Sequence, residues 1–459
     1  MSVAVEAHLA DHVDEATSEL EALCRLQSVS TDPAYKGGIL AAADFMAAAL
    51  KRSGFAEVEI IGTEGHPLIF ARSPLVSGAP TILIYGHYDV QPPDPLDKWL
   101  SPPFAPTVRN DRIYARGVSD DKGPLLIPIL VARAFSEVAG GLPLNVKFLI
   151  EGEEESGSPH FEPAVLDLKE RLACDLVVSA DGAMWRADLP SVTVAGRGLV
   201  ALDVVLHGAG KDLHSGRHGG SAPNPVRALA RMLSSLHDTD EKVIVPGFDD
   251  GMLPSDPAIL AAIEAVNFDT GAYFDGIGAA RPEPLPSGVE LLTRQWLIPT
   301  LEFNGISGGY AGAGTKTVIP STASAKITCR LVRGQDPEAV IAAITDHLEK
   351  QTPSGYRLEI LRHGPGMSAF ALDPDLTGLR IAEDILAELL GQKPLRVAMG
   401  ATIPIPGIFE KHLGTGTIFF SFSTSDEDYH APNEFLRLSS FRLGMTAWTR
   451  LFERLAMAT

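Results

Sequence analysis

Short apolar runs alternate with helix-like segments over the first part of the chain. The runs TILIY (81–85), VKFLI (146–150) and LVVSA (176–180) have the length and composition of buried parallel strands. Apolar residues at helical spacing fill 123–138 and 161–171, between these runs. Such alternation is typical of a mainly parallel sheet with helices on both faces. We therefore expect the chain to begin with an α/β domain.

The pattern changes near Ala195-Gly196. Strand-like alternation (196–208) is followed by a helical segment with proline near its start (223–238), and then by an irregular stretch (243–300). Beyond it lie two strand candidates and one helix candidate, at 316–332, 357–363 and 336–350. Leaving the irregular stretch aside, the order β-α-β-β-α-β is that of a split ferredoxin-like unit, which can close on itself. This part is predicted to be an independent α+β domain.

After Asp373 the first pattern returns. The candidate elements are one helix and two strands, at 374–390, 395–399 and 417–422. The sequence thus predicts an α/β domain made of 1–195 and 371–459, interrupted by an α+β domain over 196–370.

Composition and charge narrow the class of protein. Of the 459 residues, 45% are hydrophobic and 21% are charged, as in ordinary globular proteins. A net charge of −20 argues against binding to nucleic acid or to an anionic membrane surface. The acidic N-terminal segment differs from a signal peptide, and the most apolar stretch, GPLLIPILVARAF, is too short to span a bilayer. Three widely spaced cysteines fit reduced thiols, so we expect a soluble cytoplasmic protein.

Each of the three apolar runs ends on a residue that can bind a metal. His87 and Asp89 follow the first run, the acidic stretch EGEEE (151–155) follows the second, and Asp181 follows the third. In open parallel sheets, ligands bind beyond the carboxyl ends of the strands. These side chains should therefore meet at one edge of the sheet. Histidine and carboxylates without cysteine are typical ligands of a hydrolytic metal centre.

Two of these motifs also have a structural interpretation when taken alone. His87 can be a loop histidine with Asp89 as a capping residue. One of the adjacent aspartates Asp120 and Asp121 suits an N-cap before Gly-Pro, which leaves the other to point into the crevice.

The acidic stretch and two later residues have similar alternatives. The four glutamates of 151–155 can lie on a solvated loop, although they repel one another and a nearby cation would remove that repulsion. Asp181 and His430 would each be assigned a structural role if seen alone. Only the combination of these residues indicates a metal centre.

Six ordered motifs resemble a known family. The chain carries, in this order, GHYDVQPP, the W-x(3)-PF spacing, RGVSDDKGP, EGEEESGS, DLHSG and YHAPNE. Together they resemble the M20 family of di-metal peptidases, and most closely its dipeptidase branch of carnosinase-like and PepV-like enzymes. The likeness runs over nearly the whole chain. It implies a zinc-peptidase-like catalytic domain and an inserted lid domain through which two copies form a homodimer.

The resemblance also assigns metal ligands. It implies that His87 and Asp181 bind one ion, that Glu155 and His430 bind a second, and that Asp120 bridges the two. Two divalent ions are expected. Zinc is the first choice, with manganese or cobalt as alternatives, because residue types alone do not decide the metal.

Further roles follow from the same resemblance. Asp89 would orient His87, as carboxylates behind metal-bound histidines do, and Glu154 would act as general base. The family tends to have a cis peptide after the bridging aspartate, so we expect one between Asp120 and Asp121.

Substrate contacts are implied in the inserted domain and near residue 400. His214 would reach the partner subunit's active site and stabilise the oxyanion; the alternative is a loop histidine that caps Ser215 and Gly216. Arg330 matches an arginine that binds the terminal carboxylate of the substrate. Asn304 and Thr402 are further candidate contacts.

The predicted function is metal-dependent hydrolysis of the amide bond of dipeptides or similar small substrates with a free carboxylate, through a metal-bridging hydroxide and a glutamate base. One alternative is a deacylase or amidohydrolase that acts on N-acyl amino acids, and another is a non-catalytic metal-binding homologue. Glu153, where relatives often have an apolar residue, and Gly400-Ala401-Thr402 depart from the family pattern and leave the specificity pockets open.

Overall fold

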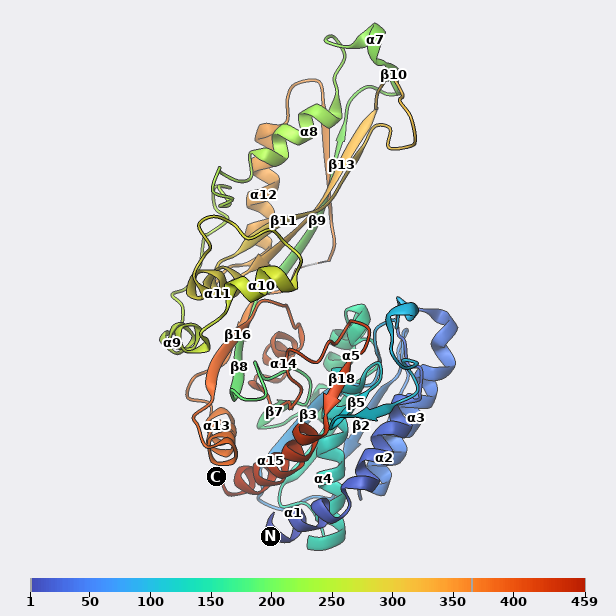
Figure 1. Cartoon of the computed structure of the whole chain (residues 1–459), viewed down its shortest axis with the longest axis vertical. Coiled ribbons are helices and arrows are strands. Elements are labelled where there is room, and N and C mark those ends of the chain that lie inside the picture. The colour runs from blue at the N-terminus through green and yellow to red at the C-terminus, as the bar shows by residue number, and fades with distance from the viewer. Residues whose placement is uncertain (1, 365, 459) are drawn as a thin grey trace. The chain divides into compact units, whose positions relative to one another are not determined.

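The computed structural model describes residues 2–364 and 366–458, which form two compact units (Figure 1). Unit 1 contains the chain up to Val194, Leu372–Val397 and the chain from Ile408 onward; unit 2 contains Ala195–Ala371 and Ala398–Gly407. The division falls within a few residues of the boundaries expected from the sequence, apart from the last segment of unit 2.

The segment Ala398–Gly407 was expected in the first domain but groups with unit 2. Hydrogen bonds explain this difference. The backbone N–H of Arg197 donates to the carbonyl of Ala401 (3.1 Å), and the Thr402 hydroxyl donates to the carbonyl of Gly198 (3.1 Å).

A six-stranded sheet forms the centre of unit 1, in the order β1-β2-β6-β3-β7-β17. Its strands are β1 (Glu57–Ile61), β2 (Leu68–Arg72), β3 (Thr81–His87), β6 (Asn145–Glu151), β7 (Leu176–Ser179) and β17 (Thr417–Phe419). β3 pairs in parallel with β6 and β7, and β17 pairs in parallel with β7, whereas β1 and β2 are antiparallel. The predicted mainly parallel α/β fold is confirmed.

Helices cover both faces of this sheet. They are α1 (Ser2–Asp11), α2 (Val13–Cys24), α3 (Lys36–Arg52), α4 (Gly123–Ala139), α5 (Phe161–Asp167), α6 (Lys169–Leu172), α13 (Thr377–Leu390), α14 (Ile405–Leu413), which crosses the unit boundary, and α15 (Leu438–Met457). On one face, Phe148 of β6 meets Phe55, just after α3, at 5.3 Å between ring centroids. On the other face, Tyr85 of β3 packs against Phe161 of α5 and Phe409 of α14. Aromatic contacts thus fix the helices on both sides of the strands that carry the site.

Unit 2 is built on a four-stranded antiparallel sheet. Its β-α-β-β-α-β elements are β9 (Gly198–His207), α8 (Pro225–Ser234), β11 (Thr300–Gly308), β13 (Thr322–Leu331), α12 (Pro337–Gln351) and β14 (Arg357–Arg362). The strand order is β11-β13-β9-β14, and every neighbouring pair is antiparallel. The predicted ferredoxin-like pattern is present, and β11 supplies the strand that the sequence did not locate.

The stretch predicted to be irregular, 243–300, contains three helices. They are α9 (Pro257–Val266), α10 (Thr270–Gly276) and α11 (Gly288–Leu297). Each has a side-chain N-cap, from Asp256, Asp269 and Ser287 respectively, and Ser287 forms a full capping box with Glu290. These caps were the local signal that the irregular assignment overlooked.

Smaller elements complete the chain. Three-stranded sheets are formed by β15 (Phe370–Ala371), β8 (Ser191–Gly196) and β16 (Leu395–Met399), and by β18 (Phe435–Arg437), β5 (Arg112–Tyr114) and β4 (Thr107–Arg109); β10 (Leu213–His214) pairs with β12 (Val318–Ile319) beside α7 (Ser215–His218). The strand predicted at 395–399 therefore exists, but outside the central sheet.

Two further sequence expectations concern cysteines and membranes. Cys24, Cys174 and Cys329 are free thiols, and the first and last are buried. Across the described residues, every helix is too short or too polar to cross a bilayer.

Candidate metal centre

The carboxyl ends of β3, β6 and β7 lie at one edge of the central sheet. In the parallel pairing, His87 is opposite Glu151, and Tyr85 is opposite Ser179, two residues before Asp181. Residues separated by about a hundred positions in sequence are thereby brought together, because parallel strands end at the same edge.

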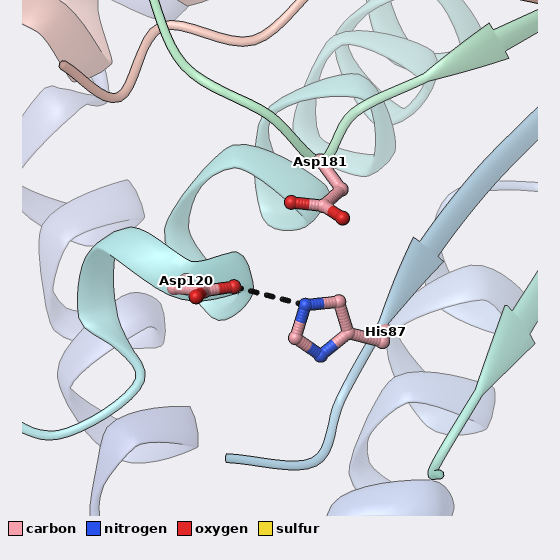
Figure 2. Close-up of side chains that lie close together, drawn as sticks. All are labelled: His87, Asp120 and Asp181. Atoms are coloured by element: carbon pink, nitrogen blue, oxygen red, sulfur yellow. Dashed lines mark hydrogen bonds and ion pairs between the residues drawn. The ribbon is translucent and has the colours of Figure 1, made fainter. Parts of the chain in front are cut away.

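Two triads of side chains meet beyond this edge. They are His87, Asp120 and Asp181, and Asp120, Glu155 and His430; within each triad the candidate ligand atoms lie within 4.8 Å of one another. Figure 2 shows the first triad, with the three side chains directed toward a common space. All five residues proposed as ligands from the sequence are present, and Asp120 belongs to both triads.

Asp120 connects the two histidines through its two carboxylate oxygens. Oδ1 lies 3.0 Å from Nε2 of His87, and Oδ2 lies 2.9 Å from Nε2 of His430. The same His430 nitrogen is 3.2 Å from Oε2 of Glu155. A carboxylate that faces one imidazole with each oxygen has the arrangement needed to bridge two cations.

The backbone at Asp120 is unusual. Asp120 lies within a π-helical turn, η3 (Val118–Lys122), but has extended dihedral angles, φ −129° and ψ 93°. The Asp120-Asp121 peptide bond is cis, as the sequence resemblance predicted. Neither aspartate caps α4. Instead, Asp120 faces the histidines, and the buried carboxylate of Asp121 accepts from the backbone N–H of His87 (3.2 Å).

The four glutamates of 151–155 do not form one acidic surface. Glu151 is buried and accepts the hydroxyl of Tyr85 (2.7 Å), and Glu153 is paired with His160 (2.9 Å). Glu155 belongs to the second triad, and Glu154 precedes it in the short 3-10 turn η4 (Glu154–Ser156). The expected mutual repulsion is therefore relieved partly by protein partners.

Asp89 lies behind the site, as expected. Nδ1 of His87 is 3.1 Å from the backbone carbonyl of Asp89 and 3.4 Å from its carboxylate, so the closer contact is with the backbone. The Asp89 carboxylate instead accepts the backbone N–H groups of Glu154 (3.3 Å) and Glu155 (3.1 Å). One residue thus holds both the histidine of the first triad and the turn that bears the glutamates.

Two residues that support the site were missed in the sequence. The amide of Gln91 donates to Glu155 Oε2 (2.8 Å). The buried carboxylate of Glu434 accepts from Arg116 Nη1 (2.8 Å) and from three backbone N–H groups, those of Gly117 (2.8 Å), Ser119 (2.9 Å) and Asp120 (3.2 Å). Gln91 and Glu434 lie inside the motifs GHYDVQPP and YHAPNE, but their partners are visible only in the structure.

The electrostatics of the site favour a cation. Burial alone would lower the pKa of His87, but hydrogen bonds with Asp120 and Asp89 raise it well above its usual value. Asp120 and Glu155 raise the pKa of His430 to about 10. Burial raises the pKa of Asp181 to about 6. A divalent ion at these atoms would stabilise the carboxylates as anions and the imidazoles as neutral ligands, so the donor set fits such an ion.

The remaining candidates lie in unit 2. His214 is exposed at the end of β10, and its Nδ1 accepts the N–H of Gly216 (3.0 Å), which is the capping contact of the structural alternative. Arg330, on β13, donates from Nη1 to the Thr402 hydroxyl (2.7 Å). Asn304 lies on the exposed part of β11, at a register shift between Phe303 and Gly305. Arg330 and Thr402 are therefore neighbours.

A mainly parallel α/β sheet that presents two linked histidine–carboxylate triads at its strand ends defines a metallohydrolase. The sequence model of peptidase family M20/M25/M40 matches residues 83–454, and the chain belongs to this family. The resemblance found in the sequence motifs is thereby confirmed.

Individual relatives point to one branch of the family. The chain is 30% identical over 383 residues to the beta-Ala-His dipeptidase of Homo sapiens, a match that covers 82% of this chain and 75% of the relative. It is 28% identical over 445 residues to the Cys-Gly metallodipeptidase DUG1 of Candida albicans, covering 92% and 90%. The solved structure of the dipeptidase Dug1p from Saccharomyces cerevisiae matches with a TM-score of 0.84 at 25% identity, over 100% of this chain and 99% of that one.

Proposed function

We propose that this protein is a metal-dependent dipeptidase that hydrolyses the amide bond of dipeptides or similar small substrates with a free carboxylate. The observation that carries this proposal is the pair of triads that share Asp120, next to Glu154. The relatives named above are dipeptidases, which supports dipeptides as the substrate class.

Two divalent ions would be held by these triads. His87 and Asp181 would bind one ion, Glu155 and His430 the other, and Asp120 both. When bound, such a pair lowers the pKa of a shared water and polarises the scissile carbonyl. Zinc is the expected metal, with manganese and cobalt as alternatives that have the same ligand preferences.

Glu154 is the proposed proton carrier. Its backbone N–H is fixed by Asp89, and the neighbouring Glu155 belongs to the second triad. Burial raises the pKa of Glu154 well above its usual value, with Asp181 and Asp120 adding to the effect. A carboxylate with a raised pKa suits a base that takes a proton from the attacking water and returns it to the leaving amine.

His214 is the proposed oxyanion donor, supplied by the partner subunit of a homodimer. Because its Nδ1 accepts the N–H of Gly216, the neutral ring carries its proton on Nε2. The capping contact and the catalytic role are therefore compatible, since the first fixes the tautomer that the second requires.

Arg330 is the proposed anchor for the substrate carboxylate. Its guanidinium already donates to Thr402, which places a hydroxyl beside it, and burial lowers the pKa of Arg330. We include Asn304 as a further contact. In this view unit 2 is the lid and dimerisation domain, unit 1 is the catalytic domain, and the protein works in the cytoplasm, where free thiols such as Cys24 persist.

A substrate panel separates this function from its alternatives. The purified chain, loaded with zinc, manganese or cobalt, is assayed on β-Ala-His, Cys-Gly and other dipeptides, and on N-acetyl amino acids. We expect kcat/KM for the best dipeptide to exceed that for any N-acetyl amino acid by at least about tenfold, a difference of roughly 1.4 kcal/mol in transition-state binding. The opposite ranking would assign the protein to the deacylases. Two bound metals without turnover of any amide would indicate a non-catalytic homologue.

A further inference from the structure

The turn that carries Glu154 and Glu155 is held from two sides. On the side of the metal centre, the Asp89 carboxylate accepts the backbone N–H groups of both residues. On the other side, the contacts are made by Glu153, the residue that departs from the family pattern.

Glu153 fixes the turn through its backbone. Its carbonyl accepts the N–H of Ser156 (3.0 Å), the hydroxyl of Ser156 (3.0 Å) and the N–H of Ser158 (2.9 Å). These bonds close the turn around Glu154 and Glu155, so any movement of Glu153 is passed directly to the two functional glutamates.

The Glu153 side chain is in turn fixed by His160. The two carboxylate oxygens lie 2.9 Å and 3.2 Å from Nδ1 of His160, the residue directly before α5. Only 8% of Glu153 is exposed to solvent, whereas 33% of the His160 side chain is exposed, so the contact is shielded on the side of the glutamate. Hence the extra negative charge beside the base is directed to a histidine on the next element of the chain.

A third segment covers this pair. A Cβ atom at Gly65 would lie 1.9 Å from Glu153 Oε1 and 2.6 Å from His160 Nδ1, closer than any real contact allows. Gly65 is exposed and does not have a positive φ, so its backbone conformation does not require glycine. The lack of a side chain at Gly65 instead allows the Glu153 carboxylate and the His160 ring to lie close to the backbone.

We propose that Glu153 and His160, covered by Gly65, form a clamp that positions Glu154 and Glu155. Neither clamp residue belongs to the metal triads, so both are positioning residues. The inference rests on the proposed function for its kinetic consequences, whereas its consequence for metal binding follows from Glu155 alone. A displacement of reacting groups by about 1 Å can lower a rate by roughly a hundredfold.

Substitution of Glu153 tests the clamp directly. Glu153→Met removes the carboxylate, whereas Glu153→Gln keeps an oxygen that can accept from His160. We expect Glu153→Met to lower kcat by roughly ten- to a hundredfold with KM changed by less than about twofold, and Glu153→Gln to recover most of the loss. Calorimetric titration with zinc should show weaker binding of one of two ions in Glu153→Met only. An unchanged kcat and unchanged zinc affinity would overturn the proposal, as would equal losses in both variants.

Gly65→Ala tests the same clamp without removing any of its charges. The added methyl group must displace Glu153 or His160, so we expect a fall in kcat of roughly tenfold with KM unchanged. The matched control is Gly62→Ala in the same loop, because a Cβ at Gly62 meets nothing within 4 Å. A second control is Glu162→Met, which removes the exposed carboxylate on α5 that is paired with His412 and Lys411 (2.8 Å each). Equal effects of Gly65→Ala and Gly62→Ala would refute the clamp.

The two proposals can fail separately. If the wild-type chain hydrolyses no dipeptide, the proposed function is wrong, and the clamp is judged on zinc affinity in the same variants. If the wild type is active but Glu153→Met and Gly65→Ala match it in kcat and in zinc binding, the clamp alone is wrong.

Discussion

Glu434→Gln should destabilise unit 1 far more than an ordinary surface substitution. One oxygen of the buried Glu434 carboxylate accepts from Arg116 and Gly117, and the other accepts from Ser119 and Asp120. In the amide, one oxygen becomes an NH₂ group that faces two donors. The glutamine will keep its oxygen on the charged Arg116, so the two N–H groups of residues 119 and 120 lose their acceptor.

The magnitude follows from this count. Each buried donor left without an acceptor costs about 1–3 kcal/mol, so two give about 2–6 kcal/mol. Breaking a buried ion pair by removing one partner costs about 3–5 kcal/mol, a range that lies inside the first estimate. We therefore expect Glu434→Gln to lower the free energy of unfolding by about 3–5 kcal/mol. Because one orphaned N–H belongs to Asp120, zinc affinity should fall as well.

Urea denaturation, followed by circular dichroism, measures the loss. The control is Glu388→Gln, which removes an exposed partner of Arg454 and Arg450 and should cost no more than about 1 kcal/mol. The double variant Glu434→Gln/Arg116→Met should cost less than the sum of the single changes, since the buried charge is removed together with its partner. A loss below about 1 kcal/mol for Glu434→Gln, or strict additivity, would show that these four contacts are not a coupled buried network.

Three further predictions use other parts of the chain. Glu154→Gln should keep two bound metals but lose roughly 10²–10⁴-fold in kcat, the usual contribution of a general base, and full turnover would remove Glu154 from the mechanism. His214→Ala should lower kcat by about 10²–10³-fold at unchanged metal content, whereas wild-type kinetics would leave His214 with its capping role alone. Burial alone would raise the pKa of Glu19, but the guanidinium groups of Arg133 and Arg52 lower it below its usual value. The Glu19 carboxylate therefore stabilises the fold at pH values above its unfolded-state pKa. This contribution is lost as the pH falls through the folded-state pKa. Glu19→Gln should therefore lose less stability than the wild type on acidification from about pH 7 to about pH 3 in urea titrations, and parallel pH curves would contradict this.

The elements of the fold that could be predicted are those with a clear local pattern of apolar and polar residues. TILIY, VKFLI and LVVSA became β3, β6 and β7 because buried parallel strands need uninterrupted apolar residues on both faces. The order of elements in unit 2 was likewise visible from strand alternation and from a proline at the start of α8. By contrast, β11 is an edge strand with mostly exposed residues and only weak alternation of apolar and polar positions. It is recognised as a strand by its pairing with β13, which the sequence does not show.

The candidate site was predictable where residue type and strand end coincide, as at His87 and Asp181. The hydrogen bonds that hold those residues in place could not be predicted, because their partners lie far away in the sequence. The Asp89 carboxylate was expected to hold His87, and it lies 3.4 Å from His87 Nδ1, but it also accepts two backbone N–H groups of the glutamate turn, 65 and 66 positions further on, which the sequence did not indicate. Glu434 lies more than 300 positions from the Arg116 that it pairs with. A single sequence gives no signal for such long-range pairs.

The carboxylates near the strand ends can be sorted by the donors that the fold supplies to them. Glu151 has the Tyr85 hydroxyl, Glu153 has His160, and Glu434 has Arg116 with three backbone N–H groups, so each has a protein partner outside the two triads. Asp120 and Glu155 instead converge on Nε2 of His87 and His430, nitrogens that can bind a metal when the imidazole is neutral. The acidic run after β6 is therefore not a block of interchangeable ligands. The backbone turns at η4, so that the last glutamates of the run, Glu154 and Glu155, lie on the side of the histidines. The cluster of like charges in the sequence therefore indicated a metal centre, but it did not identify which of the glutamates belong to that centre.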